Sequence, residues 1–163
     1  YNVHYGNLEK SLPFGKKAFD AITCLDVVEH LNHDQSALAE FSRILKPKGY
    51  LFLTVPAYQF LWTKHDAILW HKRRYRRGNL VKLVESSGFK VTKASYFYSF
   101  LIPPAILLFK LKLIFNKGRS KTTVIPPKPI NFMLMAICAL ERKIVEKVSL
   151  PTGISIFLIA QKK

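Results

Sequence analysis

The sequence predicts a single α/β domain built around a layered sheet, and three observations support this class. Apolar, β-branched runs suited to buried strands alternate along the chain with helix-type patterns. The 163 residues are enough for one core, and 49% are hydrophobic against 22% charged, as in globular proteins. The sequence has no low-complexity run and no internal repeat, so neither a linker protein nor a solenoid is expected.

The first half begins with a strand, a helix and a second strand. Residues 18–25 (AFDAITCL) and 50–55 (YLFLTV) are short apolar runs typical of buried strands. Between them, residues 34–49 (DQSALAEFSRILKPKG) carry apolar side chains at helical spacing. Asp34 is the expected N-cap of this helix, and Pro47 with Gly49 is expected to end it.

The second half predicts a helix, a strand, two apolar helices and a final strand, at residues 78–88, 89–97, 103–115, 131–148 and 153–161. Gly88 stands where a left-handed residue is expected to end the first of these helices. The uninterrupted apolar part at residues 97–109 (FYSFLIPPAILLF) is shorter than the roughly 20 residues that a spanning helix needs. We therefore expect no spanning helix; a helix lying in a membrane interface and one covering the domain's own core both remain open.

The charge is uneven along the chain. Residues 1–85 hold 13 Lys/Arg and 8 Asp/Glu, a net charge of +5, whereas residues 86–163 hold 13 and 2, a net charge of +11. The second half should therefore prefer an anionic neighbour such as nucleic acid or an acidic membrane surface, unless it is simply a solvated basic face. Cys24 and Cys138 lie in apolar patterns, which favours buried thiols without a disulfide in a reducing compartment.

Three groups that can exchange protons follow the first predicted strand. If a helical turn starts there, Asp26, Glu29 and His30 stand at i, i+3 and i+4 and share one face. Ligands of open α/β sheets bind at the carboxyl ends of strands, which is where these residues lie. The three could accept a proton from a substrate or hold a divalent ion; otherwise, they simply begin a helix turn at the surface.

Residues 65–77 (HDAILWHKRRYRR) fit three different roles. A metal site is disfavoured because His65 and His71 are six residues apart, about 240° around a helix. A nucleic-acid arm lacks a second aromatic platform near Tyr75. The third role is a cover over an active site, which depends on the elements that flank the segment.

Several stretches in one order resemble the second half of a class I S-adenosylmethionine-dependent methyltransferase. They are GNLEKSLPF, FDAITCLDVVEHL, LAEFSRILKPKGYLFLTVP, the Arg/Tyr segment with GNLVKLVESSGF, and LPTGISIFLIAQKK. The resemblance is closest to bacterial enzymes with an HDxxxxHxRRY segment and a terminal LPxGxS strand. Through TCLDVVEH it extends more distantly to the ubiquinone-type O-methyltransferases.

The resemblance implies an α/β, Rossmann-like methyltransferase sheet truncated to its fourth to seventh strands, with the last strand antiparallel and with extra apolar helices. Residues 1–163 would form one partial domain, with an apolar and basic helical insertion at residues 97–148. The family holds its cofactor with a glycine-rich loop after the first strand, and this sequence contains no GxG. We therefore expect that the first three strands were lost by truncation and that the chain alone binds S-adenosylmethionine weakly or not at all.

The same resemblance implies four cofactor contacts. Asn7 and Leu8 would bracket the adenine, and Leu25 and Asp26 would line the methionine side. Most relatives have Asp where Asn7 stands; an amide oxygen still accepts a hydrogen bond from the adenine amino group, but without the carboxylate's charge.

For the chemistry we expect His30 as general base with Glu29 orienting it, and no metal. The ubiquinone-type relatives imply instead that Asp26, Glu29 and His30 hold a divalent cation. By resemblance, residues 65–77 fold over the cofactor cleft and form one wall of the acceptor pocket. The residues assigned to that wall are His65, Asp66, His71, Arg73, Arg74 and Tyr75, with the two arginines binding an anionic group bidentately.

The leading interpretation is methyl transfer from S-adenosylmethionine to a small or lipid-linked acceptor, with oxygen as the expected atom. The protein is expected in the cytoplasm, with a peripheral position on an anionic inner membrane face as its second location. The competing interpretation is a non-catalytic Rossmann-like module that uses its basic surface on RNA, a partner protein or a membrane.

Overall fold

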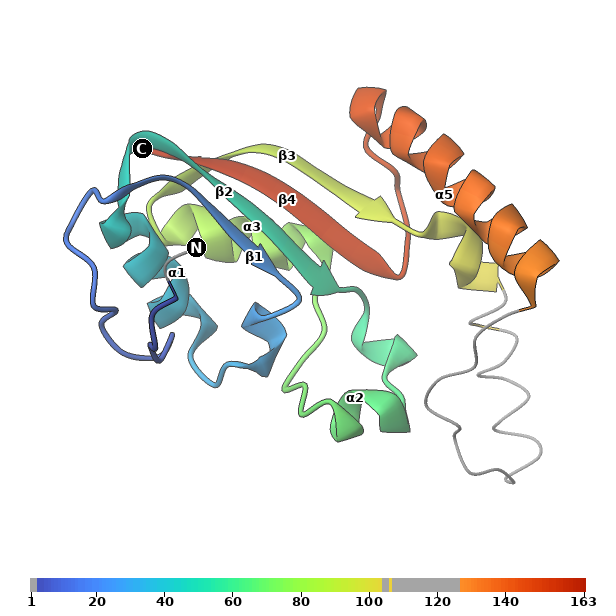
Figure 1. Ribbon diagram of the computed structural model, residues 1–163, viewed down its shortest axis with the longest axis horizontal. Helices are drawn as coiled ribbons and strands as arrows, with labels where there is room; N and C mark the ends of the chain where they lie inside the picture. Colours follow the sequence, from blue (N-terminus) through green and yellow to red (C-terminus); the bar gives the residue numbers. More distant parts are fainter. Residues whose placement is uncertain (1–2, 104–105, 107–126) are drawn as a thin grey trace.

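The computed structural model describes residues 3–103, 106 and 127–163, which contain a four-stranded sheet and its helices (Figure 1). The strands are β1 (Phe19–Leu25), β2 (Leu45–Pro56), β3 (Phe89–Phe97) and β4 (Ser155–Lys162). The helices are α1 (Asp34–Ile44), α2 (Lys64–Ile68), α3 (Arg77–Ser86) and α5 (Lys128–Lys147). Short 3₁₀ turns lie at Val28–His30, Gln59–Leu61 and Ser99–Leu101.

The strand order is β1-β2-β4-β3, so the last strand in the sequence lies between two earlier ones. β1 and β2 run parallel, and β4 runs antiparallel to both β2 and β3. β4 is paired on both edges, and Ile156, Leu158 and Ala160 on one of its faces are fully buried in the core. The predicted α/β class and the antiparallel last strand are confirmed.

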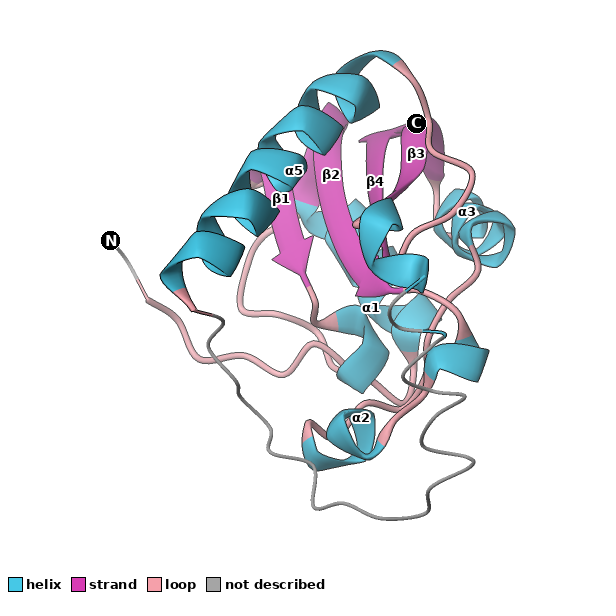
Figure 2. Cartoon of the chain, turned by 90° about the vertical axis from the view of Figure 1, so that its right-hand side faces the viewer, coloured by secondary structure: helices cyan, strands magenta, loops and turns pink. Residues whose placement is uncertain are grey.

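The core lies between one face of this sheet and the helices α1 and α3 (Figure 1). In β2, Leu51, Leu53 and Val55 point into that core, while the alternating Phe52 and Thr54 point to the other face. α1 contributes Ala37, Leu38, Phe41 and Ile44, and α3 contributes Leu80 and Val84. The second face of the sheet is left to α5 (Figure 2).

Two predicted boundaries are corrected. The N-cap of α1 is His33, and Asp34 is the first helical residue, because its carboxylate is drawn into long-range contacts with Arg73 and Tyr75. α1 ends at Ile44, and β2 begins at the next residue, so Pro47 and Gly49 lie inside the strand rather than in a stop signal. The contacts of Asp34 join residues far apart in the sequence, whereas Pro47 and Gly49 lie where the pairing of β2 with β1 is interrupted, between Leu45 and Tyr50.

The other predicted elements fall close to where the patterns put them. The strand at 89–97 coincides with β3, and Gly88 before it has a φ of 95°, the left-handed conformation expected there. The helix at 131–148 corresponds to α5. The helix predicted at 103–115 lies almost entirely outside the described residues, so the insertion at 97–148 stays a prediction.

The loop before β4 passes unusually close to β3. A Cβ on Gly153 would lie 2.3 Å from the carbonyl oxygen of Phe97, so only glycine fits. Among the helices that the structure describes, none combines the length and the apolar run required to cross a bilayer.

Candidate active site

Three chemically active side chains meet beyond the carboxyl end of β1. Glu29 and His30 come from the 3₁₀ turn that follows the strand, and His71 comes from the segment after α2. One ligand atom from each lies within 4.8 Å of the others, and the two imidazole rings are 4.7 Å apart, edge to face. The backbone N–H of Lys72 donates to the carbonyl of Glu29 at 2.7 Å and ties the two segments together.

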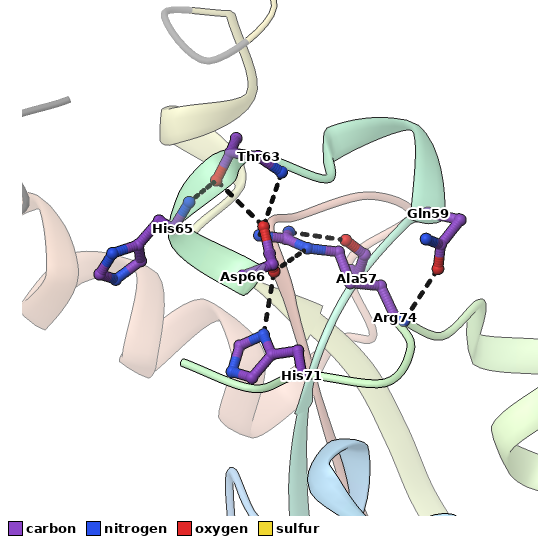
Figure 3. A network of polar contacts seen from close by, with 7 residues as sticks. All are labelled: Ala57, Gln59, Thr63, His65, Asp66, His71 and Arg74. Carbon is purple, nitrogen blue, oxygen red and sulfur yellow. Dashed lines mark hydrogen bonds and ion pairs between the residues drawn. The ribbon is translucent and has the colours of Figure 1, made fainter. Parts of the chain in front are cut away.

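The carboxylate of Asp66 organises the surroundings of His71 (Figure 3). It accepts hydrogen bonds from Arg74 Nε at 2.7 Å and from the Thr63 backbone N–H at 2.7 Å, and it lies 2.9 Å from His71 Nδ1. Thr63 and Asp66 form a capping box at the start of α2, which fixes the acid locally. Burial opposes ionisation of Asp66, but the Arg74, Thr63 and His71 contacts together lower its pKa, so it stays a carboxylate.

The ionised Asp66 also determines the tautomer of His71. A carboxylate next to Nδ1 favours a proton on that nitrogen, and Nε2 is then left to accept a proton or bind a ligand. The His71 side chain is 11% exposed, so its ring is held in place while one edge stays accessible. This arrangement, an acid orienting an imidazole, is the one that general-base catalysis uses.

Glu29 is a fully buried carboxylic acid. It is 0% exposed, and neither carboxylate oxygen has a hydrogen-bond partner within the described part of the chain. Burial, with Asp26 nearby, raises its pKa to about 7, although Arg74 works in the opposite direction. Such an acid can hold or release a proton near neutral pH, or it can bind a cation that the described residues do not supply.

A stability measurement can test the state of Glu29. Its pKa lies above the ordinary 4.5, so the folded protein binds this proton more tightly than the unfolded chain does. The free energy of unfolding should therefore fall as pH rises between about 4.5 and 7, by at most on the order of 3 kcal/mol. In urea unfolding over this range, Glu29→Gln should remove that fall, whereas Glu85→Gln, on the exposed face of α3, should keep it. An identical slope in wild type and Glu29→Gln would contradict the assignment.

The predicted pairing of Glu29 with His30 is corrected. Because the carboxylate of Glu29 makes no hydrogen bond among the described residues, it does not orient His30. The imidazole that a carboxylate holds is His71, and the carboxylate is Asp66. Asp26 is close enough to influence Glu29 but is not among the ligand atoms within 4.8 Å of one another; its φ is 51°, and its carboxylate contacts the Thr54 hydroxyl.

Three residues predicted to form the wall of the acceptor pocket bond instead to acceptors within the protein. Arg73 donates to the Asp34 carboxylate at 3.0 Å and to the carbonyls of Leu31 and Asn32, and Arg74 is bound to Asp66. Internal acceptors thus engage both guanidinium groups, and a bidentate contact with a substrate anion does not follow from this geometry. The hydroxyl of Tyr75, itself 7% exposed, donates to Asp34 at 2.9 Å.

These contacts anchor the segment instead of lining a pocket. Within the predicted wall, His71 is the residue that joins Glu29 and His30, while His65 lies exposed on α2. The sequence reasoning missed the structural role of Asp66 and Asp34. One signal could have found the first, because Thr63 stands three residues before Asp66, as in a capping box.

Comparisons with known proteins agree with this architecture. The family model described as "Methyltransferase domain" matches residues 1–53. A probable S-adenosylmethionine-dependent methyltransferase of Mycolicibacterium smegmatis is 28% identical over 55% of this chain, and the ubiquinone biosynthesis O-methyltransferase of Vibrio atlanticus is 26% identical over 44%. The chain therefore resembles the class I S-adenosylmethionine-dependent methyltransferases over parts of its sequence.

The matches cover only part of these methyltransferases. An uncharacterized protein of Methanocaldococcus jannaschii is 35% identical over 107 residues, which are 61% of this chain and 45% of that protein. The match covers 35% of each of the other two relatives. The structure of a putative methyltransferase from Bacillus halodurans superposes with a TM-score of 0.56 at 16% identity, over 96% of this chain and 75% of that one, and so supports the fold alone.

The residues that a methyltransferase of this family would use for its cofactor lie near the end of β1. Leu8, predicted beside the adenine, and Leu25, predicted on the methionine side, line one apolar pocket of about 340 Å³ together with Val27. Asp26 is exposed at the end of the strand, where a carboxylate fits a cationic group of S-adenosylmethionine. Asn7 is also exposed, and its side-chain oxygen accepts from the backbone N–H of Glu9 at 2.9 Å. These four assignments stay predictions.

Proposed function

We propose that this methyltransferase transfers a methyl group from S-adenosylmethionine to a small or lipid-linked acceptor, at an oxygen atom. The observation that carries the proposal is the His71 imidazole, oriented by Asp66 and adjacent to Glu29 and His30. A hydroxyl acceptor must lose its proton during the reaction, and an oriented imidazole is suited to take it. The name of the Vibrio atlanticus relative, an O-methyltransferase, supports the same atom.

The chemistry divides between the cofactor and this chain. S-adenosylmethionine, when bound, supplies an activated methyl group on a sulfonium. Nε2 of His71 would accept the hydroxyl proton as the methyl group passes to the acceptor oxygen; the sulfur–methyl bond would break and S-adenosylhomocysteine would leave as a neutral thioether. The Asp66 carboxylate would stabilise the imidazolium that results. His30, edge to face with His71, and the buried Glu29 limit water around the proton and offer it a second site.

A divalent cation is the second candidate role for the same cluster. Two imidazoles and a carboxylate are common ligands of zinc-like ions, and a ligating imidazole usually has a carboxylate at its other nitrogen, as His71 has Asp66. The two oxygens of Glu29 without partners in the described part of the chain favour this reading. The ligand set would then be Glu29, His30 and His71 rather than one that includes Asp26.

We also propose that the protein works in the cytoplasm, peripherally attached to the inner face of an anionic membrane. The net charge of +11 in residues 86–163 supports this location, because each Lys or Arg near an anionic surface contributes up to about 1 kcal/mol. RNA or a partner protein would be the alternative ligand of this charge, in the non-catalytic interpretation.

Calorimetry on the natural protein tests the activity. We expect S-adenosylmethionine to bind, and we expect Asp26→Ala to weaken binding while His65→Ala, an exposed residue of α2, leaves it unchanged. Adding EDTA during turnover of a hydroxylated acceptor distinguishes the two roles of the cluster, since only the cation mechanism loses activity. Absence of S-adenosylmethionine binding would refute the enzyme and favour the binding module.

A further inference from the structure

A groove of about 520 Å³ lies between α5 and the face of the sheet that α1 and α3 leave open. Its floor is formed by outward-facing residues of the strands, including Phe157 and Ile159 of β4, and its roof by Cys138 and Val145 of α5. The groove lies within the roughly 300 to 1,000 Å³ range of small-molecule sites and is lined mainly by apolar atoms. It is separate from the cluster of Glu29, His30 and His71.

One end of the groove approaches the predicted cofactor site. Thr54, which lines the groove, shares a hydrogen bond of 3.2 Å between its hydroxyl and the carboxylate of Asp26. The backbone N–H of Asp26 also lies 3.1 Å from the Thr54 hydroxyl. An apolar chain in the groove would therefore begin beside the residue assigned to the methionine side of the cofactor.

The groove lies in a half of the chain that is basic overall, which favours an anionic ligand. Its lining carries two cationic side chains, Lys93 and Arg142, and two acidic ones, Glu141 and Glu146. The Glu141 carboxylate accepts hydrogen bonds from the backbone N–H groups of Tyr98 and Ser99, at 2.8 and 2.7 Å, so much of its negative charge is compensated. These groups belong to the half of the chain with a net charge of +11.

α5 is also apolar on the side that does not contact the sheet. Phe132 is 78% exposed and Leu140 is 61% exposed, whereas Val145 on the inner side is buried. The stretch 130–140 of this helix carries no charged residue; Lys128 precedes it, and Glu141, Arg142, Lys143, Glu146 and Lys147 follow it. A helix that is apolar on both sides needs an apolar neighbour on its outer side as well, and its basic residues need an anionic one. Lipid tails beneath anionic headgroups provide both.

We propose that the groove under α5 binds the apolar chain of an anionic amphiphile, presented by a membrane on which the outer side of α5 rests. The inference deepens the proposed function and rests on it in one respect, because it makes the acceptor a lipid whose polar end reaches the site near Asp26. Binding of the chain itself requires neither cofactor nor turnover.

Titration of the natural protein with dodecyl phosphate, below its micelle concentration, tests the groove by calorimetry. Cys138→Trp fills the groove from α5 and should weaken binding at least about tenfold, since excluding two methylene groups already has that effect. Leu140→Trp places the same ring on the outer side of α5 and should leave the affinity unchanged. Ile159→Ala, which removes apolar contact from the floor without filling it, provides a second variant if Cys138→Trp does not fold.

Charge is tested separately with Arg142→Gln. This variant should weaken dodecyl phosphate binding by about fivefold but leave dodecanol binding unchanged. Equal affinities of wild type and both groove variants would overturn the inference, as would a natural protein that does not bind dodecyl phosphate because another segment covers the groove. If dodecyl phosphate binds but S-adenosylmethionine does not, the proposed function fails while the groove assignment stands.

Discussion

Replacing His71 by alanine in the natural protein is expected to lower kcat by 10²- to 10⁴-fold, the usual contribution of a general base. The affinity for S-adenosylmethionine should change little, because His71 lies on the segment after α2 and the residues assigned to the cofactor lie around β1. Steady-state kinetics and calorimetry on the same preparation measure the two effects.

His65→Ala is the matched control for this experiment. It removes the same side chain from the same short region, but His65 is exposed on α2 and outside the cluster. We expect kcat of His65→Ala within about twofold of wild type, because the substitution removes no proton acceptor from the site. If both histidine variants lose activity equally, or if His71→Ala loses cofactor affinity in proportion to turnover, His71 is not the base.

Replacing Asp66 by alanine is expected to destabilise the protein by about 3 to 5 kcal/mol, because the buried charge of Arg74 would lose its partner. Asp66 is 1% exposed and also holds His71 and the start of α2, so the position of residues 65–77 depends on it. Urea unfolding measures the loss. The kcat of the folded fraction should also fall, because His71 would lose the carboxylate that orients its ring.

Asp20→Ala provides the comparison for this loss. Asp20 also forms an ion pair, with Lys46 at 2.8 Å, but its side chain is 84% exposed. Solvent screens such pairs, so we expect an effect below about 1 kcal/mol. An equal loss of unfolding free energy in the two variants would show that the contacts of Asp66 stabilise the fold no more than an exposed ion pair does.

Local patterns were sufficient for most of the elements. The alternation in residues 89–97 predicted β3, and the β-branched run at 18–25 predicted β1 to within one residue, because strands expose a period of two that the sequence displays directly. Patterns were less informative at Pro47 and Gly49. These residues looked like a helix stop, and α1 does end before them at Ile44, but they lie within β2, where its pairing with β1 is interrupted between Leu45 and Tyr50.

The candidate site divides in the same way. Glu29 and His30 are neighbours in the sequence, so their shared position after β1 could be predicted from one local motif. The partner of Arg73 could not be predicted, because Asp34 is 39 residues away. A cationic side chain binds whichever acceptor the fold brings within reach, and here that acceptor belongs to the protein.

The sequence by itself determined the α/β class, the order of the four described strands, the basic second half and the resemblance to methyltransferases. Only the tertiary structure decided that His71 joins Glu29 and His30, that Asp66 orients it, and that α5 roofs a groove on the open face of the sheet. The physical reason is that the periodicity of apolar residues reports only the local structure of a few neighbouring residues. Burial of Glu29 and pairing of Asp66 depend instead on contacts between segments that only the folded sheet brings together.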